Sequence, residues 1–143
     1  MSSQKNVFAT ASLTVSLMCL AVPLGAHHGT NQSYDRSAPV IVKGVVTDFK
    51  YQNPHPALFI DVMDKDGKAT HWTIEIAPTP YTLALRGWSK RRSDDALKPG
   101  TVVTATLAPA RAGTPVGLLR ALVSDAGEDI LGDLDGALRT GQD

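Results

Sequence analysis

Three of the four histidines in the sequence are placed where they could bind one metal ion. His27 and His28 are adjacent, and His55 lies between two prolines in the segment Asn53-Pro54-His55-Pro56. Proline restricts the backbone dihedral φ, so we expect His55 to be held in a rigid loop. Imidazole is a ligand that suits copper, nickel and zinc. The sequence therefore predicts a metal site formed by His27, His28 and His55.

The identity of the expected metal depends on where the mature chain begins. If a signal peptide is removed after Ala26, His27 becomes the first residue and offers its α-amine together with its ring nitrogen. This chelate and a further imidazole would form a T-shaped set of three nitrogens, and tetragonal nitrogen sites suit Cu(II) or Ni(II). We therefore expect copper to be the leading candidate for the bound metal. A cleavage site shifted by one residue would remove the chelate, and a polar histidine arm that binds no metal is the competing interpretation.

Strand register separates the other two candidate residues. The hairpin described below would place His71 opposite Asp61, six residues along the strand from His55 and about 20 Å away, so we expect His71 outside the site. Glu75 would lie opposite Ala57, diagonally near His55 on the outward face. A carboxylate there could orient the imidazole as an outer partner of the metal site. The alternative is that Glu75 is simply an exposed strand residue.

Motifs for catalysis are missing from the sequence. It contains no Gly-x-Ser-x-Gly elbow, phosphate loop or Gly-x-Gly-x-x-Gly fingerprint. The segment Asp64-Lys65-Asp66-Gly67 is similar to the start of a calcium loop but lacks the closing glutamate, so we expect a hairpin turn there. The sequence therefore favours a protein that is not an enzyme, and a hydrolase or an oxidase is a third, weaker interpretation.

The charge pattern argues against nucleic acid as a partner. Lysine and arginine number 14 in total, as do aspartate and glutamate. The one cationic cluster, Lys90-Arg91-Arg92, is followed at once by Asp94-Asp95, which cancels its field within a Debye length of about 8 Å. We expect this cluster to be a solvated loop and expect no binding to nucleic acid.

The first 26 residues have the pattern of a secretory signal peptide. Lys5 precedes an apolar run over Val7–Leu20, and small residues lead to Ala26. The run is interrupted by threonine and serine, and a membrane-spanning helix needs about 20 apolar residues, so we expect no stable membrane anchor. A retained N-terminal anchor is the alternative. The only cysteine, Cys19, would leave with the signal, and the mature chain would then be a periplasmic or secreted domain without disulfides.

The elements that must position these residues are β-strands. Val40–Lys50 is rich in β-branched residues, and Gly44 in its middle suits a bend or a bulge. Apolar alternation on both sides of the turn at Asp64–Gly67 predicts a hairpin with Leu58 opposite Ile74 and Ile60 opposite Trp72. Thr79 followed by Pro80 predicts a short helix that Gly87 ends. Further strands are expected over 101–107 and 116–123, with a weaker one near 129–131.

This order of elements is that of an all-β, five-stranded, oligonucleotide/oligosaccharide-binding-like (OB-like) barrel with one short helix between strands three and four. An open β-sandwich is the alternative. We expect a signal peptide over 1–26, an N-terminal arm over 27–39, one barrel domain over 40–131 and a frayed tail over 132–143. The expected core comprises Val42, Val45, Leu58, Ile60, Trp72, Ile74, Val103 and Leu118.

Several motifs in this order resemble those of a family of small, secreted, largely uncharacterised bacterial proteins catalogued as a domain of unknown function. They are Ala26-His27-His28, Lys43-Gly44-Val45-Val46, Asn53-Pro54-His55, Trp72-Thr73-Ile74-Glu75, Arg86-Gly87-Trp88 and Leu97-Lys98-Pro99-Gly100. The resemblance covers nearly the whole mature chain, but it implies no activity.

Two functions from different classes follow from these observations. The first is a secreted or periplasmic metal-binding module, copper first, that uses His27, His28 and His55 with Glu75 as an outer partner. The second is a non-enzymatic OB-like domain that binds a small ligand or an unidentified periplasmic protein through a groove near Trp88. In that case the histidines are incidental.

Overall fold

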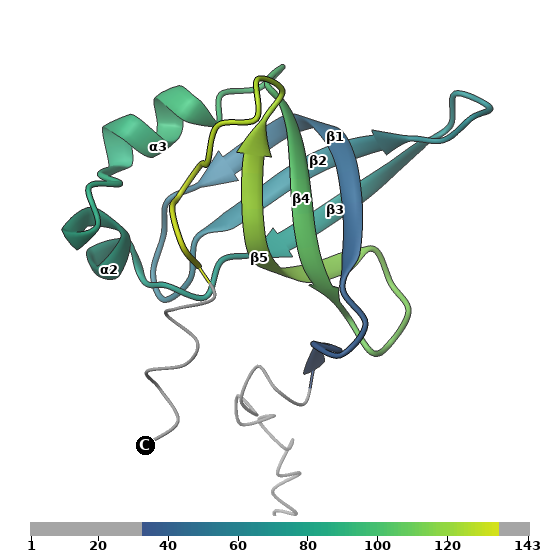
Figure 1. Cartoon of the computed structure of the whole chain (residues 1–143), viewed down its shortest axis with the longest axis horizontal. Coiled ribbons are helices and arrows are strands. Elements are labelled where there is room, and N and C mark those ends of the chain that lie inside the picture. The colour runs from purple at the N-terminus through teal and green to yellow at the C-terminus, as the bar shows by residue number, and fades with distance from the viewer. Residues whose placement is uncertain (1–32, 135–143) are drawn as a thin grey trace, which may run out of the picture.

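The structure is a computed structural model that describes residues 33–134, drawn in colour in Figure 1. Its five strands are β1 (Val40–Lys50), β2 (Ala57–Met63), β3 (Ala69–Glu75), β4 (Val102–Pro109) and β5 (Val116–Ser124). They close into a barrel in the order β1-β2-β3-β5-β4, in which only the β3–β5 pair is parallel. The predicted OB-like barrel is therefore confirmed, and the open sandwich is wrong. The expected signal peptide, His27 and His28 lie outside the described residues.

Strand β1 closes the barrel because it pairs with two neighbours in succession. Its first half, up to Val45, pairs with β4, and its second half, from Val45 onward, pairs with β2. At the change of partner, a Cβ added to Gly44 would lie 2.7 Å from the carbonyl oxygen of Asp61. Glycine is the residue that permits this close backbone approach. The register irregularity lies slightly further on, between Val46 and Asp48.

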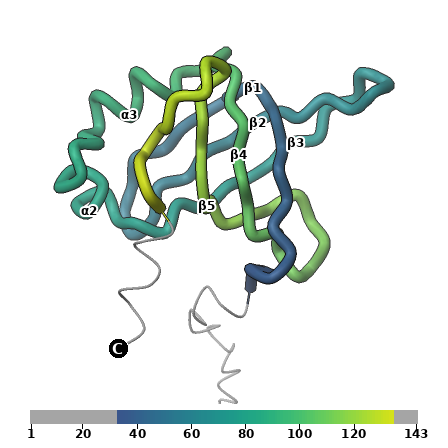
Figure 2. Tube along the Cα trace, in the orientation of Figure 1, coloured from purple at the N-terminus to yellow at the C-terminus, as the bar shows by residue number. Residues whose placement is uncertain are grey.

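The β2–β3 hairpin has the predicted register. Ile60 pairs with Trp72, and Leu58 pairs with Ile74. The backbone N–H of Asp64 donates a hydrogen bond to the carbonyl oxygen of Lys68, which closes the hairpin as expected. The turn of this hairpin extends beyond the rest of the barrel (Figures 1 and 2), whereas its other end, where Ala57 pairs with Glu75, is part of the barrel wall. Because strand alternation has a period of two, this register fixes which side chains face outward.

The barrel interior contains most of the expected core. Fully buried members include Leu58, Ile60, Ile74 and Val103, whereas Val42 and Trp72 are partly buried and pack against them. Leu118 is buried in a smaller cluster with Tyr34 and Ala108. Val45 was expected in the core, but it is 38% exposed, and Val46 is buried instead. The reason is that β1 keeps strict alternation through Gly44, so Val42, Gly44 and Val46 all face inward.

Two helices, not one, connect β3 to β4, and Figure 1 shows both on one side of the barrel. The first, α2 (Pro80–Leu85), confirms the helix predicted from Thr79 and Pro80. The side chain of Thr79 accepts a hydrogen bond from the backbone N–H of Thr82 at 3.3 Å, which caps the helix. Its residue Leu83 is buried in the core.

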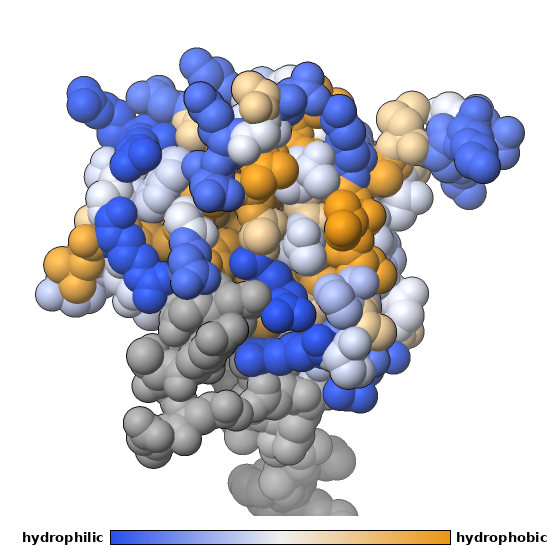
Figure 3. Space-filling view, viewed as in Figure 1, coloured by the Kyte–Doolittle hydropathy of each residue, from blue (hydrophilic) through white to orange (hydrophobic). Residues whose placement is uncertain are grey.

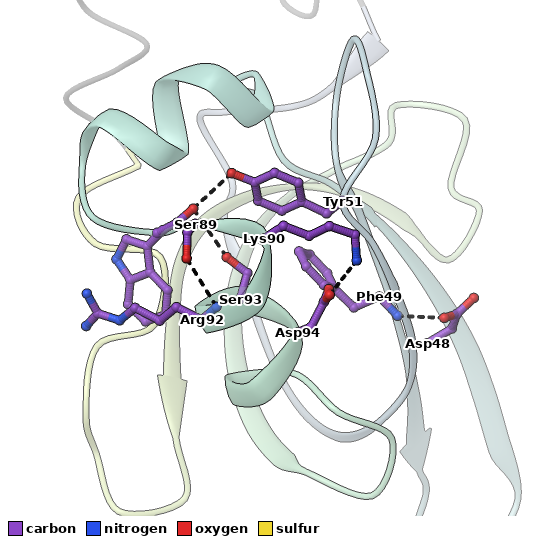
Figure 4. A network of polar contacts seen from close by, with 9 residues as sticks. Asp48, Phe49, Tyr51, Ser89, Lys90, Arg92, Ser93 and Asp94 are labelled. Carbon is purple, nitrogen blue, oxygen red and sulfur yellow. Dashed lines mark hydrogen bonds and ion pairs between the residues drawn. The ribbon is translucent and has the colours of Figure 1, made fainter.

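The second helix, α3 (Lys90–Ala96), occupies the segment expected to be a solvated loop, so that expectation is wrong. The side chain of Ser89 caps the helix. The charges that suggested a loop stabilise the helix instead, because Lys90 and Asp94 form an ion pair at the i, i+4 spacing. Leu97 follows the helix and is fully buried. Figure 4 shows the cap and the ion pair, with β1 residues nearby.

The segment after β5 packs further along the barrel than expected. It runs back beside β5 (Figure 2), and the backbone N–H of Ile130 donates to the carbonyl oxygen of Leu122 at 2.8 Å. The weak strand expected near residues 129–131 is reduced to one bridge between Val123 and Asp129. Leu134 is buried, so the packed chain continues at least three residues past the expected boundary at Leu131.

The surface of the barrel is mixed in character. Figure 3 shows hydrophilic side chains at the tip of the projecting hairpin and apolar side chains gathered over the strands on the visible face. The exposed large apolar residues are Ile41, Val45, Met63, Tyr81 and Leu85. Among residues 33–134, no helix has both the length and the apolar character needed to cross a lipid bilayer.

Candidate metal centre

His55 is held in a defined orientation by the backbone at the end of β3. The carbonyl oxygen of the next residue, Pro56, accepts a hydrogen bond from the backbone N–H of Ile76, which extends the β2–β3 ladder into the loop. The Nδ1 atom of His55 lies 2.8 Å from the carbonyl oxygen of Ala77. A carbonyl can only accept, so Nδ1 carries a proton and the neutral ring has its free lone pair on Nε2. The His55 side chain is 37% exposed, so the ring can be reached from solvent.

Glu75, the last residue of β3, lies on the Nε2 side of this ring. Its Oε1 atom is 3.9 Å from Nε2 of His55. The register that pairs Ala57 with Glu75 produces this proximity, as predicted. The expected role of Glu75 was to orient the imidazole, but the Ala77 carbonyl oxygen occupies that position at the other ring nitrogen. Glu75 therefore lies beside the nitrogen that is available to a ligand.

Tyr34 is a member of the site that the sequence did not reveal. Its hydroxyl donates a hydrogen bond to Oε2 of Glu75 at 2.7 Å. Residues 33–35 pair with the end of β4 and the residue after it, through a hydrogen bond from Asp35 N–H to the Pro109 carbonyl oxygen and a bridge between Tyr34 and Ala110. A single aromatic residue in an otherwise polar segment was the signal that could have identified it.

Burial keeps the Tyr34 phenol protonated. The ring packs against Ala108 and Leu118. Loss of hydration on burial raises the pKa of Tyr34 far above its ordinary value, and the hydrogen bond and negative charge of Glu75 raise it further. The phenol is therefore a permanent hydrogen-bond donor to Glu75 near neutral pH.

His71 lies apart from this cluster, as the register predicted. It pairs with Asp61 across the hairpin, and its Nδ1 contacts Oδ1 of Asp61. The His71 side chain is 80% exposed. It therefore forms a separate, solvated histidine–carboxylate pair.

The structure thus brings together two of the four expected site residues, His55 and Glu75. His27 and His28 lie outside the described residues. Within residues 33–134, no three histidine, cysteine, aspartate or glutamate side chains are arranged to hold a metal ion.

The aromatic residue expected beside a groove is part of the core. The Trp88 side chain is 7% exposed and packs in the main core cluster, and the guanidinium of Arg92 covers its ring at 4.0 Å (Figure 4). The Tyr51 hydroxyl donates to the Trp88 carbonyl oxygen at 2.9 Å and to the Pro80 carbonyl oxygen at 2.6 Å. These contacts join the helical segment to the barrel. The Trp88 side chain is therefore packed inside the protein and does not line a groove.

A shallow cavity of about 340 Å³ lies beside Tyr34 instead. Its lining is partly apolar and includes the cation of Arg111. The lining residues are Ser33, Tyr34, Ala110, Arg111, Ala112, Thr114 and Val116. The cavity and the His55–Glu75 pair therefore share Tyr34 as a common neighbour.

Comparison with known proteins identifies a family. No curated protein and no solved structure matches the chain. The sequence profile of a family of unknown function, DUF6152, matches residues 14–120, which is well over half of the chain. The chain therefore belongs to the family of unknown function DUF6152.

Proposed function

We propose that this protein is a periplasmic or secreted, non-enzymatic metal-binding module that binds copper first of all, through His27, His28 and His55. The observation that carries the proposal is the hydrogen bond between Nδ1 of His55 and the Ala77 carbonyl oxygen. Histidines that bind metals commonly donate their other ring N–H to a carbonyl or carboxylate, which selects the tautomer and directs the ring. His55 has this arrangement, with Nε2 free and a ring that can be reached from solvent.

The anchored position of Tyr34 supports a common site for the three histidines. Tyr34 is six positions after His28, and an extended chain spans at most about 3.5 Å per residue, so this length of chain can reach about 21 Å. Tyr34 itself is hydrogen-bonded to the neighbour of His55. The length of the arm therefore allows His27 and His28 to reach His55.

The proposal includes removal of residues 1–26 as a secretory signal. Cleavage after Ala26 would place the amine of His27 at the start of the chain. Export would also bring the site into contact with copper outside the cytoplasm.

Replacement of His55 by alanine should weaken Cu(II) binding by at least about 10–100-fold, which is the loss found for partners further from a metal. His71→Ala is the matched control, because it removes a histidine from the adjoining β2–β3 hairpin without touching the cluster. Competition titration of the chain that begins at His27 measures both variants. Equal losses would contradict the site, and so would unchanged affinity in His55→Ala.

One extra residue ahead of His27 should lower the Cu(II) affinity and change the electron paramagnetic resonance spectrum. The added residue removes the chelate of amine and ring but leaves the barrel intact. The comparison is between the chain that begins at His27 and the chain that retains Ala26. If the two forms bind alike, the terminal amine is not a ligand. Affinity in both forms should also fall as the pH decreases through about 6.5, because the imidazoles must be deprotonated to bind.

A second function, binding of a small ligand or a periplasmic partner, is favoured by the cavity beside Tyr34. Arg111 would provide a cation for an anionic group there. This second function replaces the metal-binding proposal if the chain binds Cu(II) no better than an unfolded peptide with two histidines.

A further inference from the structure

We propose that Glu75 is itself a metal ligand, through Oε1, and that Tyr34 is the residue that positions it. The inference rests on the proposed metal-binding function and extends it, because it adds a carboxylate oxygen to a site otherwise made of nitrogens. It also differs from the sequence-based expectation, in which Glu75 only oriented the imidazole.

The separation between the two side chains fits an ion between them. Nε2 of His55 and Oε1 of Glu75 are 3.9 Å apart, beyond the range of a hydrogen bond. Bonds from a transition metal to a histidine nitrogen and to a carboxylate oxygen are each about 2.0–2.2 Å long. Two such bonds laid end to end would span about 4.1 Å. An ion can therefore bind both atoms, with a wide nitrogen–metal–oxygen angle and little movement of either residue.

The remaining polar atoms of both side chains already have partners. Nδ1 of His55 is engaged by the Ala77 carbonyl oxygen, and Oε2 of Glu75 is engaged by the Tyr34 hydroxyl. One ring nitrogen and one carboxylate oxygen are left, and they are the two atoms that lie 3.9 Å apart. Hydrogen bonds from outer residues hold metal ligands in this way.

Tyr34 determines how Glu75 can bind. Because its phenol donates to Oε2, Glu75 offers Oε1 as a single oxygen rather than both oxygens together. The buried ring holds the hydroxyl in place. A phenylalanine at this position would keep the packing against Leu118 and remove only the hydrogen bond.

The same hairpin contains a histidine–carboxylate pair without these features. Nδ1 of His71 contacts Oδ1 of Asp61 directly, which leaves no space for an ion between them. Its ring is mostly exposed to solvent. Asp61→Asn is therefore a matched control for Glu75→Gln, since each removes a carboxylate that lies on β2 or β3 beside a histidine.

The donor set has a consequence for metal selectivity. Nitrogen and carboxylate oxygen in a tetragonal arrangement suit Cu(II), whereas Cu(I) prefers sulfur ligands. We therefore expect the site to bind Cu(II) in preference to Cu(I).

The chain has only two glutamates, Glu75 and Glu128, so the carboxylate can be observed directly. The chain that begins at His27 is produced with ¹³C-labelled glutamate carboxylates, loaded with Cu(II) and measured by electron–nuclear double resonance. We expect coupling of the copper to one labelled carbon. The coupling should be lost in Glu75→Gln and retained in Glu128→Gln, because Glu128 is exposed and lies after β5.

Affinity measurements test the two roles separately. Glu75→Gln and Tyr34→Phe should each weaken Cu(II) binding by about 10–100-fold, whereas Asp61→Asn should leave it unchanged. Tyr34→Phe should in addition weaken or broaden the ¹³C coupling without abolishing it, because the ligand remains but its position is no longer fixed. The wild-type coupling needs no substitution, so it tests the inference even if a variant fails to fold.

The outcomes separate this inference from the function on which it rests. If Cu(II) binds, depends on His55 and shows no ¹³C coupling, Glu75 is not a ligand, although the proposed function stands. If the coupling is present but Tyr34→Phe leaves affinity and coupling unchanged, Tyr34 does not position Glu75. A wild-type chain that does not bind Cu(II) overturns both proposals.

Discussion

Replacement of Trp88 by alanine should lower the free energy of unfolding by about 3–5 kcal/mol, the usual cost of deleting a buried aromatic side chain. Trp88 packs in the main core, and its ring is covered by Arg92. A Cβ on Gly132 would lie 3.6 Å from Nε1 of Trp88, so the ring also supports the segment after β5. The deletion would leave a cavity where α2, α3 and this segment meet the barrel.

Tyr81→Ala is the matched control for Trp88→Ala. Tyr81 is an aromatic residue on the neighbouring helix α2, but it is 73% exposed. Its removal should change the free energy of unfolding by no more than about 0.5 kcal/mol. Urea denaturation measures both variants. If Trp88→Ala costs as little as Tyr81→Ala, the packing of Trp88 in the core does not stabilise the fold as expected.

Replacement of Ile74 by alanine should cost about 2–5 kcal/mol. Ile74 is fully buried in β3 and pairs with Leu58 across the hairpin. The control is Ile41→Ala, which removes the same atoms from a β1 position that is 73% exposed, and it should cost about 0.5 kcal/mol or less. Similar denaturation midpoints for the two variants would mean that the register of the hairpin is shifted by one residue.

The register of this hairpin is also what determines the candidate site. A shift by one residue would turn Glu75 into the barrel and away from His55, because alternate strand residues face opposite sides. The Ile74 experiment therefore tests the position of Glu75 without any use of metal. A large loss of stability in Ile74→Ala and copper binding that depends on Glu75 would both support the hairpin register seen in the structure.

The proposed site combines segments that are far apart in the sequence. His55 belongs to the β1–β2 loop, Glu75 to the end of β3, and Tyr34 to the chain before β1. The fold brings these three residues together at one end of the barrel. A site built at this end can be completed by the arm that precedes Tyr34, which is why the proposal assigns His27 and His28 to the same metal.

Local patterns were sufficient to predict the hairpin. Apolar residues alternate on both sides of Asp64–Gly67, and this turn allows one pairing that keeps the apolar side chains on one face. The proximity of Glu75 to His55 and the separation of His71 from both follow from that pairing alone. The predicted cap and first turn of α2 are equally local, since Thr79 and Pro80 are adjacent.

Other features could not be predicted from neighbouring residues. The segment over α3 has charges typical of a loop, and it is helical because the residues of that segment pair with one another and Leu97 is buried against the barrel. The interior position of Val46 instead of Val45 depends on where β1 departs from regular pairing, which lies after Val46 and not at Gly44. That position is set by the two strands that β1 joins.

The sequence by itself determined the strand order, the hairpin register and the two residues, His55 and Glu75, that the register brings together, because these depend on period-two alternation and turn chemistry. Only the tertiary structure decided the closure of the barrel, the role of Tyr34 and the direction of the His55 ring. The hydrogen bond from Tyr34 to Glu75 joins residues 41 positions apart, on segments that meet only in the folded barrel, so no local pattern encodes it. The Nδ1 atom of His55 contacts the carbonyl oxygen of Ala77 by continuing the hairpin register, but which ring nitrogen makes that contact depends on the direction of the side chain, which strand alternation does not fix.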